Sequence, residues 1–306
     1  MRNKTIERIL KEIKSLVIIL IVALSLRSTI IEAYIVPTGS MENSIMTGDF
    51  LIGNKFVFGM RTPDWIGLPY TEFGFHIPWT RFPRFRVPHV GDIVIFKYPR
   101  DNFQKYVKRC VGEPGQKISI KNKELYIDEK LYALPENGKL IDNNIINEKV
   151  SQPGIFLRKE WNRDNFGPID IPKAGDKILI NNGTNWDYLM PIMLMDGHEI
   201  ILKGDGLDGE FKFTMKDPND IARRYVSGLG SILHGIFSSN DYWPSKVDKL
   251  FNKYYNPNNP GGRLLNAWNF KFTQDAWNYL WIDGTPMNSI DYYSIKQNYY
   301  WMMGDN

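Results

Sequence analysis

The 306-residue sequence is poor in the side chains that build disulfides and metal centres. Cys110 is its one cysteine, which excludes an intrachain disulfide and a cysteine-based metal site. The formal net charge of +4 is small for this length, and the basic residues do not form the clustered patches that bind nucleic acid. The four histidines lie far apart, without the spacing of metal ligands, at His76, His89, His198 and His234. We therefore expect no metal, no cofactor and no nucleic-acid partner.

Long apolar runs are also scarce, apart from the one between Leu16 and Leu26 near the N-terminus. That run alone is too short for a hydrocarbon core of about 30 Å at about 1.5 Å per residue. Residues 13–34 are long enough if Arg27 and Glu32 reach the far interface. The N-terminal end of the chain is rich in basic residues, namely Arg2, Lys4, Arg8, Lys11 and Lys14.

Basic flanks stay on the cytoplasmic side of a membrane-spanning helix. We therefore predict a cytoplasmic N-terminus at residues 1–12 and a single-pass transmembrane anchor at 13–34 in the plasma (inner) membrane. The remainder of the chain would then be extracytoplasmic. The pattern alone also fits a cleavable signal peptide, with Ala23 and Ser25 as the small residues before the cut.

Short apolar segments separated by glycine turns predict a mainly β fold after the anchor. We expect strands at 50–52, 93–97, 106–111, 118–120 and 124–127, the last two joined as a hairpin through 121–123. The sequence around Gly175-Asp176 echoes that around Gly91-Asp92, which indicates one turn type used at two strand entrances. We predict a β domain at 35–130, an inserted α+β second lobe at 131–295, and a return to the first domain at 296–306.

Within and beyond the second lobe, spacing favours helices at 219–236 and 245–255 and strands at 279–282 and 299–303. Residues 56–90 contain too much proline for a helix and are rich in aromatic side chains, among them Trp65, Phe73, Phe75, Trp79, Phe82 and Phe85. Such a segment is either a cluster packed on the core or a rim that rests in the membrane interface, where aromatic residues and arginine are favoured.

Ser40 and Lys108 are the candidates for a nucleophile and a general base. Lys108 lies in an expected strand, on the same face as Tyr106 and Cys110. A lysine with its usual pKa of about 10.4 cannot accept a proton at neutral pH, but burial can lower that pKa by several units. An outward-facing, solvated lysine is the alternative. A Ser-His-Asp triad has weak support, because no histidine is convincingly placed near Ser40.

Four segments resemble, in order and spacing, the conserved boxes of bacterial type I signal peptidases. They are residues 37–41 followed by Gly48-Asp49, residues 91–96, residues 106–115 and residues 302–306. The resemblance covers roughly residues 10–56, 90–130 and 298–306. It implies a signal-peptidase-like β fold behind an N-terminal transmembrane helix. It also implies a membrane-bound serine endopeptidase that cleaves signal peptides from exported preproteins, with preproteins and membrane lipid as partners.

Matched position by position, the resemblance makes Ser40 the nucleophile and Lys108 the unprotonated general base. The Thr38 hydroxyl and the Ser40 backbone N–H match the oxyanion donors, with threonine in place of a serine. Val36 and Val107 match the residues that line the family's small apolar substrate pockets. Arg109 and Asp305 match a supporting ion pair.

The chain departs from the family pattern at two places. Gln116 replaces an acidic residue after Pro-Gly, which we expect to be harmless, and the fourth box stops at Asn306, before an arginine and a serine that orients the lysine. We interpret this end as a C-terminal truncation. The alternatives are a catalytically impaired, membrane-anchored peptide-binding protein, a self-cleaving repressor-type Ser/Lys protease and a peptidase based on Cys110.

Overall fold

The computed structural model describes residues 2–36, 38–62, 65–67, 74–133, 135–138, 144–152, 155, 161–204, 210–215, 264–267, 272 and 276–305. The chain divides into two compact units, Met1–Pro88 and His89–Asn306. Most of the secondary structure is β, with two longer helices among the described residues. The predicted mainly β fold is confirmed.

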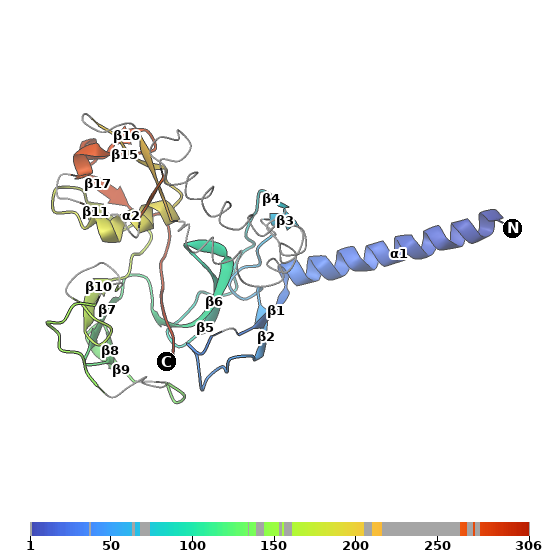
Figure 1. The fold of residues 1–306 in the computed structure, drawn as a ribbon, viewed down its shortest axis with the longest axis horizontal. Coiled ribbons are helices and arrows are strands. Elements are labelled where there is room, and N and C mark those ends of the chain that lie inside the picture. Colours follow the sequence, from blue (N-terminus) through green and yellow to red (C-terminus); the bar gives the residue numbers. More distant parts are fainter. Residues whose placement is uncertain are drawn as a thin grey trace, which may run out of the picture. The chain divides into compact units, whose positions relative to one another are not determined.

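The first unit begins with α1 (Arg2–Thr29), the long helix drawn in Figure 1. β1 (Ile31–Ile35) follows directly, so residues 31–34 of the predicted anchor lie in a strand. This short segment is rich in isoleucine and tyrosine, which favour strands, and all five of its residues pair with β2 (Phe50–Asn54). Among the described residues, no helix combines the length and the apolar character needed to cross a membrane.

The β1–β2 pair is antiparallel, with Ile35 opposite Phe50, and β2 confirms the strand expected at 50–52. Further along, β3 (Trp65–Gly67) and β4 (Gly74–His76) form a small hairpin within the aromatic segment 56–90. Several large apolar side chains around these elements are exposed, including Phe50, Ile52, Trp79 and Phe85. Whether they touch lipid stays a prediction.

One turn type precedes three strands, as the echo in the sequence predicts for two of them. Its glycine has a positive φ, of 94° at Gly48, 100° at Gly91 and 91° at Gly175, a conformation that glycine adopts without steric cost. The aspartate that follows each glycine accepts a hydrogen bond from the backbone N–H three residues earlier. These bonds join Met46 to Asp49, His89 to Asp92 and Lys173 to Asp176.

The second unit contains a sheet with the strand order β18–β6–β5. β5 (Ile93–Tyr98) and β6 (Asp101–Gly112) form a long antiparallel hairpin, which is labelled in Figure 1. β18 (Trp301–Met303) pairs with the other edge of β6, opposite residues 109–112. The strands expected at 93–97 and 106–111 are therefore confirmed, although β6 is longer than predicted. The strand expected at 299–303 is confirmed over Trp301–Met303 only.

A second sheet has the order β10–β7–β8–β9, with β7 (Lys117–Lys121), β8 (Glu124–Ile127), β9 (Lys130–Tyr132) and β10 (Phe166–Asp170). The predicted hairpin is confirmed: Asn122 and Lys123 both have positive φ in the turn between β7 and β8. β10 lies within the range 131–295, so part of the predicted insertion pairs with β7.

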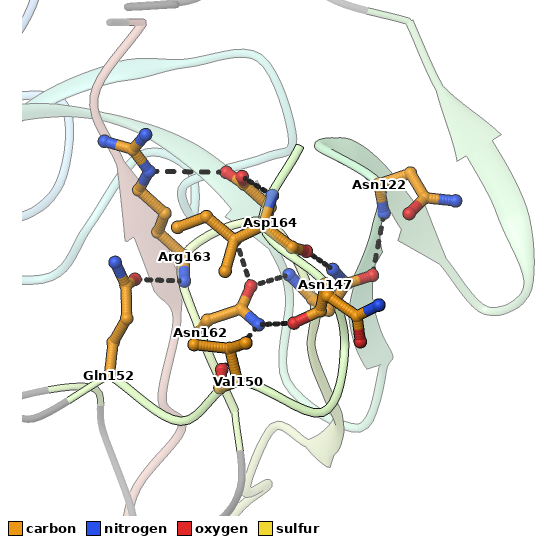
Figure 2. Close-up of polar contacts among 9 residues, drawn as sticks. Asn122, Asn147, Val150, Gln152, Asn162, Arg163 and Asp164 are labelled. Atoms are coloured by element: carbon orange, nitrogen blue, oxygen red, sulfur yellow. Dashed lines mark hydrogen bonds and ion pairs between the residues drawn. The ribbon is translucent and has the colours of Figure 1, made fainter. Parts of the chain in front are cut away.

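Figure 2 shows the polar loop that precedes β10, centred on the fully buried side chain of Asn162. Its amide nitrogen donates to the carbonyl oxygens of Asn147 and Val150, both at 2.9 Å. Its amide oxygen accepts the backbone N–H groups of Asp164 and Asn165, at 3.0 and 2.9 Å. One side chain thus ties residues 147–150 to the turn that leads into β10.

The remaining elements surround α2 (Trp186–Met195), which begins at the capping side chain of Asn185. One sheet has the order β14–β13–β12–β15–β16, and β11 (Lys177–Leu179) pairs with β17 (Tyr292–Ser294). The five-stranded sheet consists of β12 (Ile200–Leu202), β13 (Phe211–Thr214), β14 (Leu264–Asn266), β15 (Leu280–Ile282) and β16 (Thr285–Pro286). Two short 3-10 helices are η2 (Ala276–Tyr279) and η3 (Met287–Ser289). β15 confirms the strand expected at 279–282, whereas the helices expected at 219–236 and 245–255 lie outside the described residues.

Candidate active site

Ser40 lies in the connection between β1 and β2. Two backbone hydrogen bonds extend the strand ladder past the strand ends: Val36 N–H donates to the Asp49 carbonyl at 3.1 Å, and Gly48 N–H donates to the Val36 carbonyl at 2.9 Å. These bonds close the segment that carries Ser40 into a compact loop. Inside it, Glu42 N–H donates to the Gly39 carbonyl at 2.9 Å, which makes a tight turn around Ser40.

The neighbours of Ser40 in this loop differ sharply in exposure. Met41 is 1% exposed and Val36 is 4% exposed, so the backbone on both sides of the turn is held by buried side chains. Ser40 itself is partly buried and Thr38 is exposed. The turn therefore presents a serine and a threonine hydroxyl two residues apart, on a backbone that has little freedom.

Lys108 lies in β6, opposite the buried Val94 of β5. Its strand neighbour on the same face, Cys110, is fully buried. Burial lowers the pKa of the Lys108 ammonium below its ordinary value, and the nearby Asp305 carboxylate raises it by a smaller amount. Lys108 is thus a partly desolvated lysine, not a fully solvated one, and its neutral form is more accessible than that of a surface lysine.

Arg109 and Asp305 form the ion pair that the family resemblance predicts. The guanidinium donates from Nε to Oδ1 at 2.8 Å and from Nη2 to Oδ2 at 2.6 Å, a bidentate arrangement. Its Nη1 donates to the Gly91 carbonyl at 2.8 Å. Asp305 is 2% exposed at its side chain and Arg109 is 15% exposed. Donation of these hydrogen bonds to Asp305 raises the pKa of Arg109, so this arginine stays charged and holds β18 and the Gly91 turn to β6.

The hydrogen bonds accepted by the Gly91 carbonyl and by the Gln116 side chain were not predicted from the sequence. Gln116 Oε1 accepts the Glu113 N–H at 2.7 Å. A carboxylate oxygen could accept the same bond, which explains why an amide can replace the acidic residue of the family here. Glu113 Oε1 in turn accepts the Val90 N–H at 2.9 Å, beside the Gly91 turn.

The predicted site residues fall into both compact units. Val36, Thr38 and Ser40 belong to Met1–Pro88, and Val107, Lys108, Arg109 and Asp305 belong to His89–Asn306. Within the second unit the structure brings Arg109, Asp305 and Lys108 together. The pairing of Ser40 with Lys108 and the pocket roles of Val36 and Val107 stay predictions.

Comparison with known proteins finds one matching family and several similar sequences. Residues 9–184 match the sequence model of the family described as "Signal peptidase, peptidase S26". Signal peptidase I of Pseudomonas aeruginosa is 33% identical over 162 residues, which are 51% of this chain and 52% of the relative. Signal peptidase I of Rickettsia massiliae is 35% identical over 158 residues, or 51% of this chain and 53% of the relative.

Signal peptidase I of Rickettsia bellii is 33% identical over 136 residues, which are 44% of each chain. The chain thus spans about half the length of the curated relatives it matches. The family match covers more than half of the chain, including the Ser40 turn and the Lys108 strand. The chain belongs to the signal peptidase family, peptidase S26.

Proposed function

We propose that this protein is a membrane-bound serine endopeptidase that removes signal peptides from exported preproteins with a Ser40/Lys108 dyad. The observation that carries the proposal is the partial burial of Lys108, which lowers the pKa of its ammonium. A general base must be unprotonated at the working pH, and burial is the physical means of achieving this for a lysine. Membership of the signal peptidase family supports the class of substrate.

In the proposed reaction, Ser40 Oγ attacks the scissile carbonyl carbon while the neutral Nζ of Lys108 takes the hydroxyl proton. The C–N bond then breaks, and the Lys108 ammonium returns that proton to the leaving amine. Water then attacks the resulting ester on Ser40 and loses a proton to Lys108. The ester C–O bond breaks, and the Lys108 ammonium returns that proton to Ser40 Oγ. The products are the mature protein, the cleaved peptide and the free enzyme, with Lys108 neutral at the start of each half-reaction.

Thr38 and the backbone of Ser40 are proposed to stabilise the negative charge that develops on the carbonyl oxygen. The Thr38 hydroxyl is exposed, and the local turn fixes the backbone that carries the Ser40 N–H. Donors placed where charge develops contribute roughly 3 kcal/mol each in other proteases. Val36 and Val107 would line the small apolar pockets that accept alanine-like side chains before the cut.

The edge of β6 offers a place for an extended substrate. β18 covers this edge only opposite residues 109–112, and among the described strands only β5 pairs with Val107 and Lys108. Backbone groups at an open strand edge can bind an extended peptide by strand addition. We therefore propose that the preprotein segment lies along β6 at Val107 and Lys108.

The membrane location rests on α1 and its sequence. The large apolar side chains along the middle of this helix are exposed, for example Leu16 at 67%, Ile19 at 65% and Leu20 at 53%. Such side chains are stabilised when apolar surroundings replace water. With the basic first turns on the cytoplasmic side, we propose a single pass that leaves the β units outside the plasma (inner) membrane.

The test of the dyad is a cleavage assay on a preprotein, with the protein expressed from its complete reading frame and reconstituted in lipid. Ser40→Ala and Lys108→Ala should each reduce the cleavage rate by about 10⁶-fold, the order of loss seen when a catalytic serine or its base is removed. Lys105→Ala is the matched control, because Lys105 lies in the same strand on the opposite face. It should retain most of the wild-type rate.

Near-normal cleavage by Lys108→Ala would contradict the proposed base, and near-normal cleavage by Ser40→Ala would contradict the proposed nucleophile. An inactive wild-type protein, with both preprotein and lipid present, would contradict the proposed function as a whole. Equal losses in Lys105→Ala and Lys108→Ala would show that the effect comes from the strand and not from the base.

A further inference from the structure

Asp196, at the C-terminal end of α2, collects hydrogen bonds from a segment about a hundred residues later in the sequence. Its Oδ2 accepts the Tyr293 hydroxyl at 2.6 Å and the Lys296 backbone N–H at 3.0 Å. Its Oδ1 accepts the Tyr299 hydroxyl at 2.8 Å. One carboxylate thus fixes three points along residues 293–299, the stretch that leads from β17 to β18.

Tyr299 is the most firmly held of these points. Besides Asp196, its hydroxyl oxygen lies 3.1 Å from the Ile192 carbonyl and 3.2 Å from Gln297 Nε2, and its backbone N–H donates to the Pro172 carbonyl at 3.1 Å. Burial raises the pKa of the Tyr299 phenol, so the group stays protonated and able to donate. Its ring packs against both apolar clusters of the second unit, one around α2 and one around β7 and β10.

β18 begins two residues after Tyr299 and is very short. Its three residues pair with β6 opposite Gly112, Cys110 and Arg109, with an irregularity after Trp301. A strand of this length makes few ladder hydrogen bonds, so its register needs support from outside the strand. Asp305, two residues beyond β18, depends on the same register to reach Arg109.

We propose that Tyr299, held by Asp196, is a positioning residue that sets the register of β18 on β6 and thereby the surroundings of Lys108. The proposal rests on the proposed function only in taking Lys108 as the general base. It gives the lobe around α2 a role in the chemistry, because α2 supplies both Asp196 and the Ile192 carbonyl.

The expected consequence of losing this bond has a definite sign. If β18 shifts or frays, water reaches the side of β6 that carries Lys108, and renewed solvation favours the ammonium. The Asp305 carboxylate would move away as well, which favours the neutral amine, but desolvation is the larger of the two influences on Lys108. On β5 the residue opposite Lys108 is the uncharged Val94. The titration of Lys108 should therefore move to higher pH.

Tyr299→Phe tests the proposal, with Tyr293→Phe as its matched control. Both variants remove one hydroxyl bond to the same carboxylate and keep the aromatic ring, but only Tyr299 adjoins β18. The first measurement is competitive labelling of lysine amines with acetic anhydride across pH, with the Lys108 peptide quantified by mass spectrometry. The second is the pH profile of kcat/KM for preprotein cleavage, in the protein from its complete reading frame.

Tyr299→Phe should raise the apparent pKa of Lys108 and move the acid limb of kcat/KM upward by the same amount. Cleavage at pH 7 should fall about fivefold, the factor that corresponds to one typical hydrogen bond, while KM changes little. Tyr293→Phe should change both readouts less than twofold. If Tyr299→Phe does not fold, Asp196→Asn, which keeps the side-chain size, should move Lys108 in the same direction.

Equal shifts in the Tyr299→Phe and Tyr293→Phe proteins would overturn the proposal, and so would an unchanged Lys108 titration in Tyr299→Phe or in its substitute Asp196→Asn. The labelling readout does not depend on catalysis. If the Lys108 titration shifts as expected but Lys108→Ala still cleaves normally, Tyr299 positions β18 and the proposed function fails instead.

Discussion

The Ser40 turn and the Lys108 strand are built in opposite ways. The turn is closed by backbone hydrogen bonds between residues 36 and 49, and its buried anchor Met41 is the next residue after Ser40. The surroundings of Lys108 depend on Asp305, whose partner Arg109 lies 196 residues away in the sequence. A serine presented by a local turn depends on a short stretch of sequence. A lysine whose pKa depends on burial needs the sheet around it.

Asp305→Asn should cause the largest loss of stability, and the loss should be located around Lys108. The substitution leaves the largely buried Arg109 guanidinium without its carboxylate, and breaking such a buried pair costs about 4 kcal/mol. Chemical denaturation should show this loss in the free energy of unfolding, and hydrogen exchange should increase at the β6 and β18 amides. Unchanged hydrogen exchange at the Ser40 turn in the same protein would show that the two regions are stabilised independently. A loss below about 1 kcal/mol would mean that the pair is not structurally important.

Met41→Ala should have a somewhat smaller effect, located in the other region. Met41 is 1% exposed, and truncating a buried methionine to alanine costs about 3 kcal/mol. Amides between residues 36 and 49 should exchange faster, whereas amides of β6 should not. Met46→Ala is the matched control, because Met46 lies in the same loop but is 49% exposed. Similar losses in the two variants would argue against Met41 as the anchor of the turn.

Asn162→Ala should have the smallest effect of the three and should act on neither region directly. The variant loses four hydrogen bonds, including the one that the amide oxygen accepts from the buried Asp164 N–H, at a cost of about 2 kcal/mol (Figure 2). Asn147→Ala, which removes a single exposed hydrogen bond to the Lys149 N–H, should cost much less. Thermal or chemical unfolding of both proteins measures the difference. A changed pKa of Lys108 in Asn162→Ala would show that this loop and the Lys108 strand are not independent.

Local signals in the sequence predicted the parts of the fold that local interactions determine. The Gly-Asp turns, the 121–123 hairpin and the strands flanking Lys108 all follow from glycine positions and apolar alternation within a few residues. The helix α1 was harder to delimit, because the isoleucine-rich segment after Thr29 fits an apolar helix as well as a strand. The segment forms a strand because residues 31–35 pair with β2.

Other features could not be predicted, because they depend on contacts between distant segments. The Asp196 side chain has no local pattern that distinguishes it from any aspartate at a helix end, and its partners lie about a hundred residues away. The pairing of β10 with β7 also joins distant segments, because Phe166 lies opposite Ile120 and Asp170 lies opposite Lys117. The Arg109–Asp305 pair was predicted only through the resemblance to the signal peptidases, because neither residue has a local feature that identifies the other.

We propose that Lys108 acts as a neutral base because the sheet partly buries it. The most direct measurement is the titration of the Lys108 amine by competitive labelling, in the wild-type protein and in Ser40→Ala, beside the pH profile of kcat/KM. A base must lose its proton to act, so kcat/KM should rise with pH through the pKa of Lys108 and level off above it. Lys108 should titrate below the usual value of about 10.4 and at the same pH as the acid limb. An amine that titrates near 10.4 in an enzyme already fully active at pH 7 would contradict it.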